Sequence, residues 1–258
     1  MVHSSTSRRL GPAFVMVAVA FTVGCSADTA LPQGSEPITL DPAEFTSTID
    51  NPYWPMVPGT RWIYRETDGA GTELRVVVTV THDTKKIANG VTARVVRDTV
   101  FDGSAVVEDT FDWYAQDQDG TVWYLGEQTA EFENGEVMTT AGSFEAGVDG
   151  ALPGVVMPGS PTPGTAYRQE YYAGEAEDNG EILSITEMAD SPYGHFDDVL
   201  LTRDTVALEP DVLEYKFYAK GVGPVLALGV SGGAGREELV SVETVPAGTG
   251  TGPLGDPD

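Results

Sequence analysis

The residue types that most suggest chemistry lie in the stretch FDWYAQDQDGTVWYLGE, residues 111–127. Asp117 and Asp119 precede a glycine there, as carboxylates do in the middle of an EF-hand-like calcium loop. A complete loop of that kind needs a carboxylate two residues before Asp117 and a glutamate six residues after the glycine, and those positions hold Ala115 and Gly126. Because this ligand set is broken, we predict a solvated hairpin turn without a metal. Asp117 with Asp119 is the weaker, metal-binding alternative.

Other residues that could perform catalysis do not form a recognisable set. His82 and His195, the histidines beyond the N-terminal leader, show no HExxH or other metal-ligand spacing. The glycine run GGAG at residues 232–235 is not followed by the helix pattern that a phosphate-binding loop requires. We therefore predict a protein without enzymatic activity and without a cofactor.

Aromatic side chains of the same stretch could instead bind a ligand. Alternation along VVEDTFDWYAQ places Asp109, Phe111 and Trp113 on one face of a strand. Tyr215 and Phe217 take the equivalent face of a later strand. The side chains that could together line an apolar cavity are Phe111, Trp113, Trp123, Tyr124, Tyr171, Tyr172, Tyr215 and Phe217. A small curved sheet can fill its interior with side chains or leave room for one ligand, and both possibilities stay open here.

Short β-branched and aromatic runs, separated by turn residues, must position these side chains. RVVVTVTH at residues 75–82 places alternate valines on one face, and ARVVRDTV follows at residues 93–100. Asn89 and Gly90 between them form a strong hairpin-turn signal. With 30 glycines, 17 prolines and little helix periodicity, the sequence predicts an all-β fold, an antiparallel and strongly curved sheet or barrel.

A repeat with a nearly constant offset runs through this pattern. The matching pairs are PGT at 58–60 and 163–165, RDTV at 97–100 and 203–206, and WYA at 113–115 with FYA at 217–219. They predict two copies of a unit of about five strands, residues 57–127 and 162–230. The second copy of the aromatic hairpin, KFYAKGVGPVLALG, has no aspartate. The aspartates of the first copy are therefore an addition to a shared architecture.

The N-terminus has the features of an export signal. Arg8 and Arg9 precede an uncharged apolar run at residues 12–24, whose length fits a signal peptide better than a membrane span. The run ends in TVGC, which resembles the lipobox of bacterial lipoproteins, although Thr22 stands where leucine is usual. The resemblance implies cleavage before Cys25 and a lipid on its sulfur. The alternative is a soluble secreted protein cut near CSADTA.

Differences in composition divide the chain into four predicted segments. Residues 1–24 are the predicted signal peptide, and the polar, proline-bearing residues 25–50 are predicted to be a flexible tether behind the lipid. Residues 51–245 are predicted to form a single β domain that contains both repeats. Residues 246–258, rich in glycine and proline, are predicted to be a disordered tail.

The net charge of the chain restricts the classes of molecule that its surface can bind. The chain has 40 acidic and 14 basic residues, a formal net charge of −26 at pH 7. Removal of a leader containing Arg8 and Arg9 leaves 12 basic residues against the same 40 acidic ones, a net charge of about −28. Such a surface repels the phosphate backbone, which excludes nucleic acid, and it also repels anionic lipid. We therefore expect the lipid on Cys25 to hold the protein at the extracytoplasmic face of the cell membrane.

Two segments carry a further resemblance. NPYWPMVPGTRWIY at residues 51–64 and FYAKGVGPVLAL at residues 217–228 resemble a broad group of uncharacterised exported bacterial β-proteins, especially actinobacterial lipoproteins. The first segment opens the domain in that group, and the second forms a late hairpin of a strongly curved sheet, similar to half-barrel or lipocalin-like lipid carriers. The resemblance implies no enzymatic activity and no catalytic residues.

Two functions follow from these observations. The first is a membrane-anchored binding or carrier module for an apolar or amphipathic small molecule. The alternative is a structural or interaction lipoprotein with a filled interior, which binds a protein or cell-envelope partner through its acidic surface. Whether the interior is hollow distinguishes the two.

Overall fold

Alternating β-branched and aromatic residues form one sheet in the computed structural model, which describes residues 30–232 and 235–257. A short 3-10 turn, η1 (Pro42–Glu44), precedes the strands. The fifteen strands of this described part are β1 (Phe45–Thr46), β2 (Thr60–Thr67), β3 (Glu73–Lys86), β4 (Thr92–Asp102), β5 (Ala105–Asp117), β6 (Val122–Glu133), β7 (Glu136–Thr139), β8 (Phe144–Glu145), β9 (Gly154–Met157), β10 (Ala166–Arg168), β11 (Asp178–Ser191), β12 (Gly194–Val206), β13 (Leu213–Ala219), β14 (Gly223–Ser231) and β15 (Arg236–Thr244).

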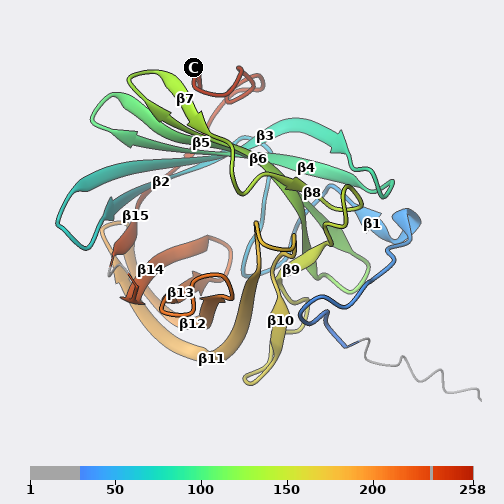
Figure 1. Cartoon of the computed structure of the whole chain (residues 1–258). Coiled ribbons are helices and arrows are strands. Elements are labelled where there is room, and N and C mark those ends of the chain that lie inside the picture. Colours follow the sequence, from blue (N-terminus) through green and yellow to red (C-terminus); the bar gives the residue numbers. More distant parts are fainter. Residues whose placement is uncertain (1–29, 233–234, 258) are drawn as a thin grey trace, which may run out of the picture. The chain divides into compact units, whose positions relative to one another are not determined.

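Nearly every strand pairs with its neighbour in sequence. The hydrogen-bonded order is β10-β11-β12-β13-β14-β15-β2-β3-β4-β5-β6-β7, with β1 on β5 and with β8 and β9 on β6. β15 returns to β2, so the last strand joins the two halves of the sheet. Figure 1 shows the sheet curling until β2–β7 face β11–β14 across an interior. The predicted all-β fold, an antiparallel and strongly curved sheet, is confirmed, and the path of strands stays open between β10 and β7.

The pairing register decides which side chains share the concave face. Directly opposite residues of an antiparallel pair point to the same side of a sheet. Val78 lies opposite Trp62 on β2 and opposite Asp98 on β4. Val96 of β4 lies opposite Asp112 of β5, one residue before Trp113. These opposite pairs line the interior, and residues one position along each strand therefore belong to the outer face.

The hairpin of β5 and β6 has the turn that its sequence predicts. The Asp117 carboxylate accepts hydrogen bonds from the backbone amides of Asp119 and Thr121, at 3.0 and 2.9 Å. Its second oxygen accepts a hydrogen bond from the Trp123 indole at 2.8 Å. Gly120 closes the turn with φ of 84°, which favours glycine. Asp117 therefore organises the hairpin through its own hydrogen bonds.

The segment before the first long strand packs on the sheet. Leu31 is half-buried and Pro32 is buried, and the Arg168 backbone amide donates to the carbonyl of Pro32 at 2.7 Å. The Arg168 guanidinium, 1% exposed, donates to the carbonyls of Gly34 and Glu36 at 2.7 and 2.8 Å. Leu31–Asp258 is one compact unit. The prediction of a flexible tether up to residue 50 is therefore wrong from residue 31 onward, because a buried guanidinium needs acceptors and this segment supplies them. Cys25 and residues 1–24 lie outside the described residues.

The C-terminal tail is held in the same way on the outer face. Arg97, 1% exposed, pairs with the buried carboxylate of Asp109. The guanidinium also donates to the carbonyls of Gly252 and Pro253, at 3.0 and 2.8 Å. The amide of Gly255 donates to Asp109 at 2.7 Å. The prediction of a disordered tail is wrong for residues 246–257, because main-chain groups of this glycine- and proline-rich segment satisfy a buried ion pair.

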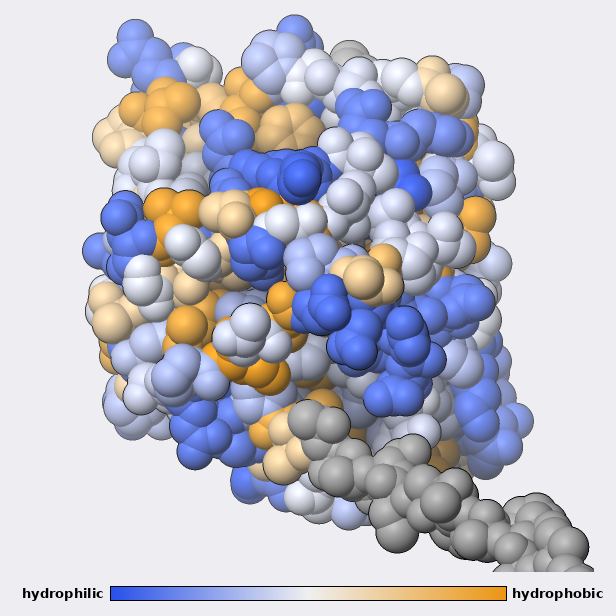
Figure 2. Space-filling view, turned by 90° about the vertical axis from the view of Figure 1, so that its right-hand side faces the viewer, coloured by the Kyte–Doolittle hydropathy of each residue, from blue (hydrophilic) through white to orange (hydrophobic). Residues whose placement is uncertain are grey.

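The surface is mainly hydrophilic. On the face drawn in Figure 2, hydrophilic residues predominate, and hydrophobic ones occur in small groups among them. Within residues 30–232 and 235–257, no helix has the length and apolarity needed to cross a membrane.

Candidate binding cavity

A cavity of about 510 Å³ lies in the interior of the curled sheet. Side chains from both halves of the sheet line it, from β2–β5 on one side and from β11–β15 on the other. A volume of this size is within the range of small-molecule sites. The interior is therefore partly hollow, and its lining falls into an aromatic part and a carboxylate part.

Five aromatic rings form the first part of the lining. They are Trp54, Trp62, Tyr64, Tyr114 and Tyr218. Trp54 lies between the rings of Tyr114 and Tyr218, at centroid distances of 5.7 and 5.5 Å. The Trp62 indole donates to the Val222 carbonyl at 2.8 Å, so its polar atom is satisfied by the protein. The ring faces can therefore contact an apolar body.

Seven carboxyl groups form the second part. They are Glu66, Asp98, Asp112, Asp178, Asp204, Glu214 and Glu237. The cations in the described lining are Lys216 and Arg236, and Arg236 is paired with Glu238 at 2.7 Å. The cavity is thus strongly acidic rather than apolar, which corrects the expected character of the interior.

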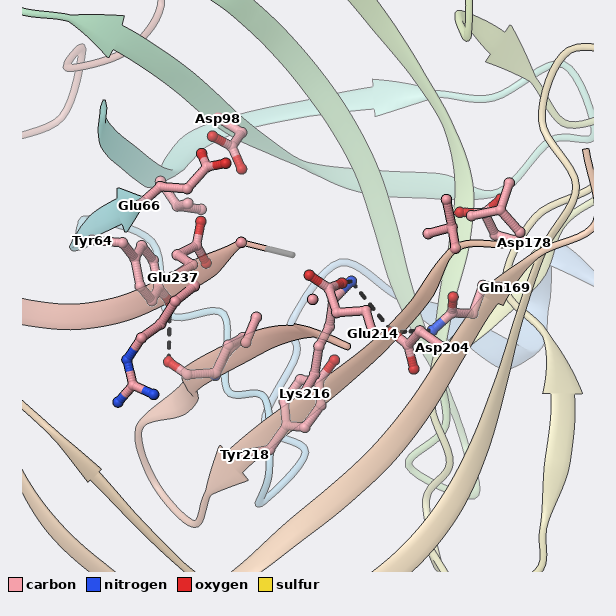
Figure 3. Close-up of a pocket in the computed structure, with 18 of the residues that line it drawn as sticks. Tyr64, Glu66, Asp98, Gln169, Asp178, Asp204, Glu214, Lys216, Tyr218 and Glu237 are labelled. Carbon is pink, nitrogen blue, oxygen red and sulfur yellow. Dashed lines mark hydrogen bonds and ion pairs between the residues drawn. The ribbon is translucent and has the colours of Figure 1, made fainter. Parts of the chain in front are cut away.

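Lys216 neutralises one side of the cavity. Its ammonium group lies 3.1 Å from Glu214 and 3.3 Å from Asp204. The amide of Gln169 also donates to Asp204, at 3.2 Å, as Figure 3 shows. Burial lowers the pKa of Lys216, but the charges of Glu214 and Asp204 outweigh burial and raise this pKa well above its ordinary value. Lys216 is therefore a charged partner for these carboxylates.

Glu66, Asp98 and Glu237, which we call the carboxylate wall, lie on the other side (Figure 3). Glu66 and Glu237 are directly opposite each other in the register of β2 and β15. Burial, with the charge of Glu66, raises the pKa of Glu237 to about 7. Burial, with the charge of Asp112, raises the pKa of Asp98 well above its ordinary value. Burial and the charge of Glu214 also raise the pKa of Glu66.

A second group of carboxyls continues behind Asp112. The Tyr124 hydroxyl lies 2.7 Å from Asp112 and 2.6 Å from Glu127, and its ring stacks on Tyr114 at 5.0 Å. Burial, with the charge of Glu127, raises the pKa of Asp112 to about 8. Burial raises the pKa of Glu127 to about 7, and burial with the charge of Asp178 raises that of Glu170 to about 9. The interior can therefore hold several protons near neutral pH.

Four of the predicted ligand-binding residues lie on the outer face. Phe111 and Trp113 alternate with Asp112 and Tyr114, which line the cavity. Tyr215 and Phe217 likewise alternate with Lys216 and Tyr218. The expectation that these aromatics point into the interior is wrong. Trp113 is buried on that face, where the Lys85 ammonium lies 3.5 Å from the centroid of its ring, and the other three are half-buried.

The other four, among them Tyr172 between β10 and β11, occupy separate positions. Trp123 packs edge-on against Phe45 at 6.0 Å and donates to Asp117. Tyr171 lies between β10 and β11, where its carbonyl accepts from Leu152 at 2.8 Å. Tyr124 supports the cavity through Tyr114 and Asp112 without lining it. Trp113 and Phe217 lie on the same face, as the repeat requires, and the repeat itself stays a prediction.

The sequence GVSGG at residues 229–233 matches GxSxG, the pattern that surrounds the nucleophilic serine in α/β-hydrolases. Ser231 ends β14 and lines the cavity, and its hydroxyl donates to the Asp211 carbonyl at 2.7 Å. A strand-to-helix turn is the usual setting of a nucleophilic serine in this pattern, whereas β15 follows here. His195 pairs with Asp190 at 2.7 Å, so its hydrogen bonds go elsewhere.

Among the residues that the structure describes, no group of three or more His, Cys, Asp or Glu side chains could hold a metal ion.

Comparisons with known proteins give two similar solved structures. No protein-family model and no curated protein matches the chain. A Parabacteroides distasonis protein described as a lipoprotein is 12% identical, with a TM-score of 0.39, over 74% of this chain and 98% of that one. A Bacteroides fragilis protein described as exported, with a YmcC-like fold, is 14% identical, with a TM-score of 0.42, over 74% and 99%. The actinobacterial part of the resemblance stays a prediction.

Proposed function

We propose that the protein is a membrane-anchored, extracytoplasmic binding or carrier module that holds one small amphipathic molecule inside its curled sheet. The observation that carries this proposal is the cavity of about 510 Å³. Its wall combines ring faces, which can contact an apolar body, with polar groups that can orient a ligand.

The hollow interior favours this function over a structural lipoprotein with a filled interior. Protein cores are close-packed, with few voids larger than a water molecule. Seven carboxyl groups gathered around one cavity oppose folding, because their charges repel and each loses part of its hydration. A ligand that contacts these groups offsets that loss, whereas a purely structural role does not.

The proposal includes no enzymatic step. Ser231, which matches a nucleophile pattern in the sequence, donates its hydroxyl hydrogen to the Asp211 carbonyl. The raised pKa values in the interior have a common first cause, burial, and serve binding equally well.

The binding function is tested with 6-propionyl-2-dimethylaminonaphthalene, an uncharged dye whose emission shifts to the blue in apolar surroundings. We expect saturable binding that weakens at least fivefold in Ala227→Trp, because Ala227 lines the cavity. Val240→Trp is the matched control, since Val240 is 40% exposed. Equal binding by the parent and Ala227→Trp would contradict the proposal.

The anchor is tested separately with Cys25→Ser. The TVGC motif supports lipidation of Cys25, and the acidic composition offers no other attraction to anionic lipid. We expect the variant to move from the membrane fraction to the soluble fraction of the cells. Unchanged membrane association would exclude Cys25 as the anchor.

A further inference from the structure

We propose that the cavity binds a primary amine in its ammonium form, with the cation at the carboxylate wall of Glu66, Asp98 and Glu237 and the apolar body against the aromatic rings. This inference rests on the proposed binding function and adds the chemical class of the ligand.

The first argument is the uneven pairing of charge in the cavity. Asp204 and Glu214 both contact the ammonium group of Lys216. No cationic side chain in the described part of the chain lies within ion-pair distance of the carboxylate wall, because the nearby Arg65 and Arg236 are both bound to Glu238. The protein thus supplies a cation to one side of the cavity and leaves the other side acidic.

The second argument is the position of the unpaired groups. Like charges directly opposite each other in a sheet are destabilising, and Glu66 and Glu237 take such positions. Oδ1 of Asp98 is buried without a hydrogen-bond partner in the described protein. Asp204, only 6% exposed, also leaves Oδ1 without a partner at the cavity. Buried acceptors in this state are satisfied by a ligand that brings N–H donors.

The third argument is the match between an ammonium group and these acceptors. A primary ammonium group has three N–H donors and no acceptor, so it can satisfy several carboxylate oxygens at once. A carboxylate ligand would add a negative charge to an already acidic cavity. The ring of Trp54 contacts those of Tyr114 and Tyr218 in the lining of the same cavity, and these rings can receive the apolar body of the amine.

The experiment compares three naphthalenes that differ in one substituent, at about 0.15 M salt so that long-range attraction is screened. They are 1-naphthylmethylamine, which is a cation at pH 7.5, the neutral 1-naphthalenemethanol and the anionic 1-naphthoate. Calorimetric titration should show the amine binding at least tenfold more tightly than the alcohol, and the acid binding least.

A charge-removing variant assigns the effect to the carboxylate wall. In Glu66→Gln/Asp98→Asn/Glu237→Gln, the amine should lose its advantage over the alcohol to within threefold, while the alcohol binds as in the parent. The matched control is Glu131→Gln/Glu133→Gln/Glu136→Gln, which replaces the same number of carboxyl groups at exposed positions of β6 and β7. It should keep the advantage of the amine. If the triple variant fails to fold, the single changes Glu66→Gln and Glu237→Gln each should reduce the advantage.

Each outcome separates the two proposals. Equal binding of alcohol and amine by the parent overturns the ammonium inference and leaves the binding function intact. Loss of amine binding in the exposed control overturns the role of the carboxylate wall. Absence of binding by all three compounds contradicts the binding function itself, and the inference falls with it.

Discussion

The Tyr124 hydroxyl lies 2.7 Å from Oδ1 of Asp112, and the same hydroxyl lies 2.6 Å from Oε2 of Glu127. A tyrosine hydroxyl has one hydrogen, so it donates to one of these carboxyl groups at a time. The other carboxyl group can satisfy the phenolic oxygen only by carrying a proton. This geometry agrees with the raised pKa values of Asp112 and Glu127, about 8 and about 7. The two carboxyl groups therefore share a proton near neutral pH.

Tyr124→Phe should destabilise the protein by about 1–3 kcal/mol at pH 8, because two buried carboxyl groups lose a hydrogen-bond partner. At pH 5.5 the loss should be smaller, since protonated carboxyl groups can donate to each other. Urea unfolding at both pH values measures the free energy of unfolding. Tyr193→Phe is the control, because Tyr193 is 47% exposed. An equal loss at both pH values would argue that packing, not proton sharing, is the contribution of Tyr124.

Stability should decrease as pH rises from 5.5 to 9. Burial raises the pKa of several interior carboxyl groups, with Glu237 at about 7 and Glu170 at about 9, whereas their pKa values in the unfolded chain are near 4. The folded state therefore binds more protons than the unfolded state in this window, and their stabilising contribution is lost as pH rises through the folded pKa values. We expect the midpoint of thermal unfolding to fall by several degrees, at about 2–4 °C for each kcal/mol.

The same measurement has an internal control. Glu237→Gln should give a shallower decrease, because the amide does not titrate. Below about pH 4 the opposite trend should appear, since hydrogen bonds from Arg236 and Arg65 lower the pKa of Glu238 and that contribution disappears on protonation. A midpoint that is constant or rises between pH 5.5 and 9 would contradict the assignment of these carboxyl groups.

Lys216→Met should destabilise the protein by about 1–3 kcal/mol at pH 8, because Asp204 and Glu214 lose their cation. The side chain of Lys216 is 36% exposed, so solvent screening makes this loss smaller than for a fully buried pair. Ethylammonium chloride should restore part of the lost stability, beyond the effect of the same concentration of sodium chloride. Lys86→Met, an exposed control, should show neither effect. Equal responses to both salts would contradict a direct replacement of the Lys216 cation.

The sequence predicts the strands and hairpins well, because alternation and turn residues are local signals. It does not predict which face of β5 is the inner one. Trp113 is 5% exposed and Asp112 is 8% exposed, so both faces of this strand are buried. Hydrophobicity favours Trp113 as the inward residue, and the structure shows Asp112 there. The error arises because the outer face is covered by other parts of the chain, which alternation along one strand does not reveal.

The repeat in the sequence indicates which residues face the interior. Asp98 and Asp204 occupy the same place in the two copies of RDTV, and both line the cavity. Tyr114 and Tyr218 likewise occupy the same place in WYA and FYA. Matching polar residues within a repeated strand pattern could have been identified as inward-facing candidates.

The terminal segments show a second reason why the sequence does not predict the whole structure. Their composition indicates disorder, yet their main-chain carbonyls satisfy Arg97 and Arg168, two buried guanidinium groups. Every residue has such a carbonyl, so no residue pattern distinguishes the carbonyls that a distant arginine will use.

Asp117→Asn should destabilise the protein by about 1–2 kcal/mol, with or without calcium. The Asp117 carboxylate accepts three hydrogen bonds, from two backbone amides and from the Trp123 indole. An asparagine oxygen can accept the two backbone bonds, but its NH₂ group then meets the indole N–H, and two donors face each other. Asp119→Asn is the matched control, because Asp119 is exposed, and we expect no measurable change. Thermal unfolding of the parent and both variants with calcium and with chelator is the measurement. A parent midpoint that rises with calcium and fails to rise in both variants would reveal a metal site in this hairpin.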